Sequence, residues 1–278
     1  MPRVALLGAG PIGASIAQRL AERSPARDIL LIDDNAGAAQ GKALDIMQAG
    51  PIDGSSARLT GGSDPLAAAG ADVIVLADDS VKGAWDGEAG LQLIAQLMRA
   101  GTNAPLVFAA PSQVPLMEAA ARELHVPGDR VIGTAASAME PIVASLVNIE
   151  LGRTGTMVSV TGRPPSLTVA WSAATIGGEL VTDLVPAHRL LAIAQSIARI
   201  WPPGPQAIAA PTARVIEALL SGSRRSLSAL TVLDGELGVR GRAGLLPLEL
   251  GGGRVLQRHV PAQSPQERTE TITALLRS

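Results

Sequence analysis

Residues 4–34, VALLGAGPIGASIAQRLAERSPARDILLIDD, contain the pattern that decides the fold. A short apolar run at 4–7 is followed by the glycine-rich turn GAGPIG, and a helical pattern then extends to about Glu22. A second apolar run, 29–32, ends at Asp33. This order predicts a strand, a glycine turn, a helix and a second strand parallel to the first.

The glycine turn has the spacing of a dinucleotide site. Gly8 permits a tight turn, Gly10 lets a diphosphate approach the backbone, and Gly13 lets the helix pack closely on the strand. Asp33 follows Gly13 by twenty positions, where its carboxylate can accept both ribose hydroxyls. The alternative is a glycine turn that binds nothing. The predicted cofactor-binding residues are Gly8, Gly10, Pro11, Ile12, Gly13 and Asp33.

The charges after the second strand indicate which dinucleotide fits. Asp34 follows Asp33 directly, and the next basic residue is Lys42. Two carboxylates would repel a 2′-phosphate, so NAD is favoured and NADP is disfavoured.

Composition excludes several classes of function. The chain has 278 residues, with 23 basic and 25 acidic side chains and a net charge of −2, and it has no basic stripe. Three Trp and one Phe offer no platform on which bases could stack, so no nucleic-acid partner is expected. Cysteine is absent, which excludes disulfides and thiolate chemistry. The apolar runs are short, so we expect no transmembrane helix and a cytoplasmic location.

The order of predicted strands and helices changes near Gly133 and divides the chain in two. Up to Gly133 apolar strands alternate with helices, which predicts a parallel sheet covered on both faces. Beyond it the pattern mixes long helices with later strands. We therefore predict an α/β fold, a Rossmann doubly wound parallel sheet (1–135) followed by an α+β domain for substrate and oligomer contacts (136–278). The expected strands after residue 34 are 71–77, 105–109, 130–133, 157–160, 228–233 and 245–250, and the expected helices are 36–48, 91–100, 116–124, 139–151, 186–200, 212–220 and 264–276.

Motifs along nearly the whole chain carry a family resemblance. They include GAGPIG, ILLIDD, GKALDIMQ, ADVIVLA, RVIGT, IGGELV, VIEALL, GELGVRG and LLPLELGGGRV, in that order. With them the chain resembles the lactate/malate dehydrogenase family of NAD-dependent 2-hydroxyacid oxidoreductases. The resemblance implies hydride transfer to or from a small carboxylic acid. It also implies a homo-oligomer, a dimer or a tetramer, and a His base held by an Asp, with one Arg gripping the carboxylate and another on a lid.

The residues at those positions depart from the family. Arg163 stands where the resemblance places the His, and a guanidinium stays protonated and cannot act as a base. The three histidines, His125, His188 and His259, all fall elsewhere and are expected at the surface.

The other catalytic positions have changed too. The Asp and the carboxylate-binding Arg correspond to Met139 and Ile142, and Lys82 is the only base in the shortened lid. Asp78 and Asp79 follow the third matching strand near the expected diphosphate, where each would oppose a phosphate by about 1 to 4 kcal/mol at 4 Å. NAD binding is therefore expected to be weakened, unless both side chains point to water, cap the lid helix or share a metal with the phosphate.

Three hypotheses follow. The first is an NAD(H)-binding protein of the oxidoreductase superfamily without the family's usual 2-hydroxyacid dehydrogenase activity. The second is an active NAD-dependent oxidoreductase on an altered hydroxy or oxo acid, with Arg163 as the substrate contact and Ser112, Ser166 or Thr168 relaying a proton. The third is a structural paralogue that binds nothing and associates through helices such as 36–48 and 139–151.

Overall fold

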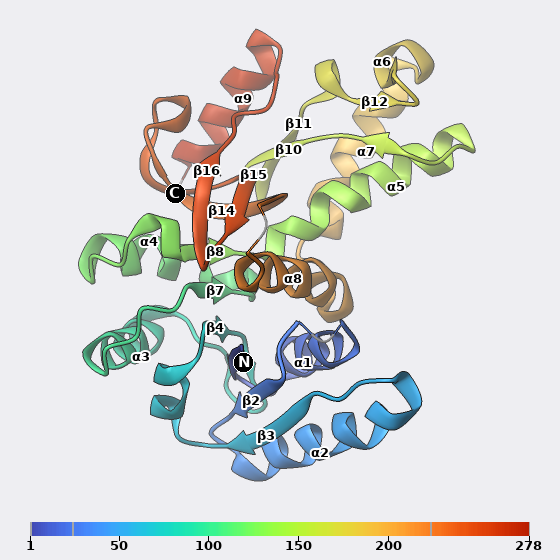
Figure 1. Cartoon of the computed structure of the whole chain (residues 1–278). Coiled ribbons are helices and arrows are strands. Elements are labelled where there is room, and N and C mark those ends of the chain that lie inside the picture. Colours follow the sequence, from blue (N-terminus) through green and yellow to red (C-terminus); the bar gives the residue numbers. More distant parts are fainter. Residues whose placement is uncertain (1, 24, 223, 278) are drawn as a thin grey trace.

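The computed structural model describes residues 2–23, 25–222 and 224–277. Its N-terminal half is a parallel sheet in the order β3-β2-β1-β4-β7-β8, in which β1 is central and the chain winds outward in both directions (Figure 1). This doubly wound arrangement confirms the predicted fold class. The strands are β1 (Arg3–Leu7), β2 (Asp28–Ile32), β3 (Arg58–Gly62), β4 (Val73–Leu76), β7 (Leu106–Phe108) and β8 (Val131–Gly133).

Both faces of the sheet are covered because its strands are apolar throughout. In β1, Val4 and Leu6 point to one core, and Ala5 and Leu7 point to the other; all four are fully buried. Helices α1 and α2 cover the first face together with α8, whereas α3 and α4 cover the second (Figure 1). The bounds are α1 (Pro11–Arg23), α2 (Ala36–Asp53), α3 (Gly87–Arg99), α4 (Val114–Glu123) and α8 (Pro205–Leu220).

The C-terminal half continues the same sheet with antiparallel strands. β14 pairs with β8 on one side and with β15 on the other, and β15 carries β10 and β16. Eleven strands of the described chain thus form one sheet across the predicted boundary at 135/136, which stays a prediction. The strands are β10 (Val160–Arg163), β11 (Ser166–Val169), β14 (Arg225–Asp234), β15 (Arg240–Gly251) and β16 (Arg254–Arg258).

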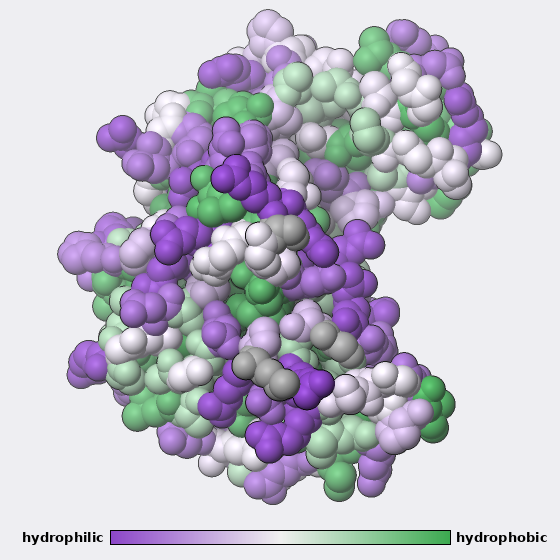
Figure 2. Space-filling model, viewed as in Figure 1, coloured by the Kyte–Doolittle hydropathy of each residue, from purple (hydrophilic) through white to green (hydrophobic). Residues whose placement is uncertain are grey.

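Further helices pack around the C-terminal half. Two small sheets, one of three strands and one of two, are separate from the main sheet. The helices are α5 (Met139–Leu151), α6 (Val181–Leu184), α7 (Ala187–Ile200) and α9 (Pro265–Leu276). The small sheets contain β5 (Asp78–Asp79), β6 (Gly83–Ala84), β9 (Thr156–Met157), β12 (Thr175–Ile176) and β13 (Glu179–Leu180). Hydrophilic and apolar residues are intermixed on the face shown in Figure 2. Within the described ranges, every helix is too short or too polar to cross a membrane.

Several elements differ from the sequence predictions. The edge strand β3 and the strand β16 were not predicted, because both are partly exposed and lack a clear apolar alternation. Helix α8 begins seven positions before the expected Thr212 and contains Pro211. Burial of Ile208 and Ala209 against the sheet offsets the helix-breaking effect of that proline.

Candidate functional site

The glycine turn has the predicted strand–turn–helix geometry. Gly8 leaves β1 with φ of 119°, a conformation that favours glycine. A Cβ on Gly13 would lie 2.1 Å from the carbonyl oxygen of Gly8, so only glycine lets α1 pack this closely. The turn therefore presents the N-terminus of α1 toward the position expected for a cofactor diphosphate.

The carboxylate of Asp78 occupies that anion position. It accepts hydrogen bonds from the backbone N–H groups of Ile12 at 3.1 Å and Gly13 at 2.9 Å. A Cβ on Gly10 would lie 2.6 Å from the Asp78 carboxylate carbon, so the side chain sits directly against the turn. A negative charge at a helix N-terminus is stabilising, and here the chain itself supplies it.

No backbone N–H of the turn is left for a ligand. Gly8 donates to the carbonyl of Ile32, and Gly10 donates to the carbonyl of Asp78 at 2.7 Å. Ala9 donates to the Asp33 carboxylate at 2.8 Å, and Pro11 has no N–H. Together with the two bonds to the Asp78 side chain, these contacts use every donor between residues 8 and 13.

Asp33 is also fully engaged within the chain. One carboxylate oxygen accepts from Ala9 and from the Ser80 backbone, both at 2.8 Å, and the other accepts from Asn35 at 3.0 Å and from the Ser80 hydroxyl at 2.6 Å. A carboxylate has about four lone-pair positions, so none remains for ribose hydroxyls. Burial raises the pKa of Asp33, but these hydrogen bonds together outweigh it and hold the pKa below its ordinary value.

Asp79 holds the tip of the loop that follows β4. Its side chain is buried and accepts from the backbone N–H groups of Val81 at 2.8 Å, Lys82 at 2.9 Å and Asp34 at 3.1 Å. The ammonium group of Lys82 forms an ion pair with Asp34. The sequence left open whether Asp78 and Asp79 point to water, cap the lid helix or share a metal with the phosphate. The structure comes nearest to the second of these, but Asp78 caps α1 and not the lid helix α3.

A dinucleotide and the chain itself would compete for the same groups of this site. Its diphosphate would need the turn amides that Asp78 already uses, and its ribose would need the acceptors that Ser80 already fills. In the described part of the chain, no three His, Cys, Asp or Glu side chains gather as a metal centre would require.

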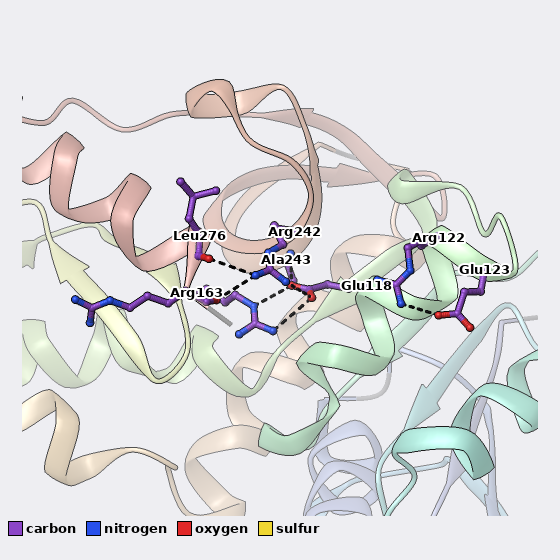
Figure 3. Close-up of polar contacts among 8 residues, drawn as sticks. Glu118, Arg122, Glu123, Arg163, Arg242, Ala243 and Leu276 are labelled. Atoms are coloured by element: carbon purple, nitrogen blue, oxygen red, sulfur yellow. Dashed lines mark hydrogen bonds and ion pairs between the residues drawn. The ribbon is translucent and has the colours of Figure 1, made fainter.

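Arg163, at the position of the family's His, is held in an ion pair (Figure 3). Its Nε donates to Glu118 at 2.8 Å and its second guanidinium nitrogen donates at 3.4 Å. Glu118, on α4, also receives Arg242 at 3.3 Å and the backbone N–H of Ala243 at 3.0 Å. Only 11% of the Arg163 side chain and 6% of the Glu118 side chain are exposed. The guanidinium of Arg163 is thus paired within its own chain.

The positions that the resemblance assigns to the Asp and to the carboxylate-binding Arg carry apolar side chains. Met139 is fully buried, and Ile142 packs against the core. In the turn after β7, Gln113 is buried and links two backbone groups: it accepts a hydrogen bond from the N–H of Ala110 at 2.9 Å and donates to the carbonyl of Trp85 at 2.9 Å. All three histidines are exposed, as expected, and lie outside these contacts.

The sequence did not reveal three residues that shape the site. Ser80 was missed although it directly follows the two acids of the loop. Glu118 could have been noticed as the one acid within the apolar run 114–121, where a buried carboxylate needs a partner. Arg242 gave no local signal, because its partner lies 124 positions away.

A cavity of about 610 Å³ lies elsewhere, between α5, α8 and β14. Glu140 lines it, and burial raises the pKa of this carboxyl although the Ser228 hydroxyl donates to it at 2.6 Å. No residue of the glycine turn lines this cavity.

The doubly wound sheet, the glycine turn and the acid after β2 define a dinucleotide-binding dehydrogenase scaffold. Residues 2–94 match the family described as lactate/malate dehydrogenase, NAD binding domain. The malate dehydrogenase of Thermomicrobium roseum is 32% identical over 275 residues, covering 91% of this chain and 88% of the relative. A malate dehydrogenase of Dehalococcoides mccartyi is 28% identical over 277 residues, covering 92% of this chain and 90% of the relative.

This protein therefore belongs to the lactate/malate dehydrogenase family. NAD and a carboxylic acid are the ligands that fit this family.

Two solved structures share the fold. The minor L-lactate dehydrogenase of Enterococcus mundtii superposes with a TM-score of 0.87 at 20% identity, over 98% of this chain and 95% of the other. The malate dehydrogenase of Salinibacter ruber gives a TM-score of 0.85 at 24% identity, over 98% and 93%. At these identities the likeness concerns the fold alone.

Proposed function

We propose that this protein keeps the NAD-binding scaffold of its family but does not carry out the usual 2-hydroxyacid dehydrogenase reaction. The observation that carries the proposal is the ion pair between Arg163 and Glu118. The Arg163 guanidinium has no hydrogen-bond acceptor, so it cannot take the hydroxyl proton, and it is already paired with Glu118, so it cannot bind a substrate carboxylate. Loss of a general base alone lowers a rate by roughly 10² to 10⁴.

The alternative of an oxidoreductase with Arg163 as its substrate contact has less support. A carboxylate substrate would have to compete with Glu118, which contacts two nitrogens of the same guanidinium. Displacing Glu118 would also leave it buried with Arg242 as its remaining ionic partner. The geometry thus favours a structural role for Arg163.

We also propose that the chain forms a homo-oligomer in the cytoplasm, with a dinucleotide as its small-molecule ligand. Large apolar side chains on two helices support self-association, because Ile52 of α2 is 88% exposed and Ile149 of α5 is 76% exposed. Light scattering on the purified chain tests this, and a monomer at micromolar concentration would contradict it. A monomer would also remove the main argument for a purely structural paralogue.

Turnover with standard substrates tests the main proposal. The purified protein is assayed with malate, oxaloacetate, lactate and pyruvate and with NAD(H) and NADP(H), beside a malate dehydrogenase relative as positive control. We expect rates at least about 10²-fold below the control. Robust conversion of any of these acids would refute the proposal, and turnover abolished by Arg163→Ala would favour the altered-substrate alternative.

A further inference from the structure

The loop between β4 and α3 fills the place of a cofactor. We propose that residues 78–84, which we name the strap, are an internal occupant of the dinucleotide site, and that a dinucleotide binds only after the strap has moved away. The Asp78 carboxylate stands in for a cofactor phosphate on the α1 N-terminus, and Ser80 stands in for the ribose hydroxyls on Asp33. This inference concerns cofactor binding and goes beyond the proposed loss of hydride transfer.

The strap reproduces both polar contacts that the motif offers a dinucleotide. At the helix end, the Asp78 carboxylate takes the amides of Ile12 and Gly13 at 3.1 and 2.9 Å. At the ribose end, the Ser80 hydroxyl donates to Asp33 at 2.6 Å, as a ribose hydroxyl would. Two anions cannot share one helix N-terminus without strong repulsion, so bound diphosphate and the Asp78 carboxylate exclude each other at this position.

The backbone of the strap closes the turn as well. The Asp78 carbonyl accepts from Gly10 at 2.7 Å, and the same oxygen would lie 2.3 Å from a Cβ on Gly8. The second glycine of the motif, whose missing side chain lets a diphosphate approach, is therefore approached by the chain itself. A rotamer change at Asp78 would not clear the site, because the main chain of the strap must move too.

The strap is held by hydrogen bonds and not by apolar burial. Val81 at its tip is 75% exposed, and the side chain of Lys82 is 70% exposed. Gly83 and Gly87 follow with φ of 84° and 53°, and a Cβ on either would meet nothing within 4 Å. Such a segment can leave without opening the core, and glycines at its end can absorb the change in backbone angles.

An internal occupant changes cofactor affinity in a defined way. The closed chain offers no site, so the apparent dissociation constant for a dinucleotide is the intrinsic one divided by the open fraction. Substitutions that remove the contacts of the strap raise that fraction and must tighten binding. A residue that bound cofactor directly would give the opposite sign.

The experiment is an NADH fluorescence titration of three proteins. They are the wild type, the Asp78→Ala/Ser80→Ala double variant and the control Asp86→Ala. Asp86 carries the same charge and follows the strap at the N-terminus of α3, and its exposed side chain makes no capping hydrogen bond. We expect the double variant to bind NADH at least tenfold more tightly than the wild type, and the control to stay within about twofold of the wild type.

Two results would overturn the proposal. One is equal affinity of wild type and double variant, including no binding by either while circular dichroism shows both folded. The other is weaker binding by the double variant, which would make Asp78 or Ser80 a cofactor contact. Because the readout is binding, it is independent of the turnover assay that tests the proposed function.

Hydrogen exchange on the wild type covers the case in which the double variant does not fold. With NADH raised until it binds, we expect the amides of Ser80, Val81 and Lys82 to exchange faster than in the free protein. Bound NADH with unchanged protection of these amides would overturn the proposal, because cofactor and closed strap would then coexist.

Discussion

Replacing Glu118 by Gln should destabilise this protein more than replacing either arginine that pairs with it. The carboxylate pairs with both Arg163 and Arg242 and accepts a hydrogen bond from the N–H of Ala243. Its removal leaves two guanidinium groups facing an amide, one of them with only 11% of its side chain exposed. Removing one arginine leaves the carboxylate with the other.

The structure sets the expected sizes. Breaking a buried ion pair by deleting one partner costs about 3 to 5 kcal/mol, which we assign to Glu118→Gln. Arg163→Met leaves Glu118 paired with Arg242 and costs about 1.5 to 3 kcal/mol, the range for a hydrogen bond to a charged group. Arg122→Gln is the matched control, because the pair of Arg122 with Glu123 is 67% and 46% exposed and contributes about 0 to 1 kcal/mol.

Urea unfolding at pH 7, followed by circular dichroism, measures these differences, provided that the slopes with denaturant agree. The double variant Glu118→Gln/Arg163→Met should lose less than the sum of its single variants, because the buried cation leaves with its partner. Equal costs of Arg163→Met and Glu118→Gln would refute the difference expected from the second partner, Arg242. A cost of Glu118→Gln no larger than that of the Arg122 control would refute the strength of the ion pair itself, and Arg163 would then be free for another ligand.

Three further predictions concern the turn, the buried Asp33 and the half-buried Glu140. Gly13→Ala should yield no folded protein by circular dichroism, because its Cβ would lie 2.1 Å from the Gly8 oxygen. The control Gly41→Ala lies on α2, where the added Cβ would meet nothing within 4 Å. It should stabilise the helix by up to about 1 kcal/mol and raise the melting temperature. Asp33→Asn should cost about 1 to 3 kcal/mol in urea at pH 7. Folding lowers the pKa of Asp33 from 3.8, so its contribution to the free energy of unfolding is complete above that pH and is lost as the pH falls through the pKa of the folded state. The stabilities of wild type and variant should therefore converge in acid. A difference that stays constant with pH would contradict this. Burial raises the pKa of Glu140 from 4.5, so the wild type should lose stability as the pH rises from 4.5 through the pKa of the folded state. Glu140→Gln should reduce this dependence of stability on pH. Identical pH profiles of wild type and variant would contradict the prediction.

Local sequence was sufficient where local sterics decide the structure. The roles of Gly8 and Gly13 follow from which backbone angles and contacts a Cβ forbids, and the structure has the strand, turn and helix that they predict. The apolar runs likewise predicted most of the parallel strands, because a strand buried on both faces needs no polar side chain. The edge strands escaped prediction because exposure removes that signal.

The sequence by itself determined the doubly wound scaffold, the glycine turn and the absence of a histidine between Val126 and Ala187. Only the tertiary structure decided what the unusual charges do. Asp78 lies 65 positions from the amide of Gly13, and Glu118 lies 45 positions from Arg163. Whether a carboxylate repels a phosphate or takes its place depends on where the folded chain sets it, since Coulomb and hydrogen-bond energies depend on distances in space that sequence spacing does not contain.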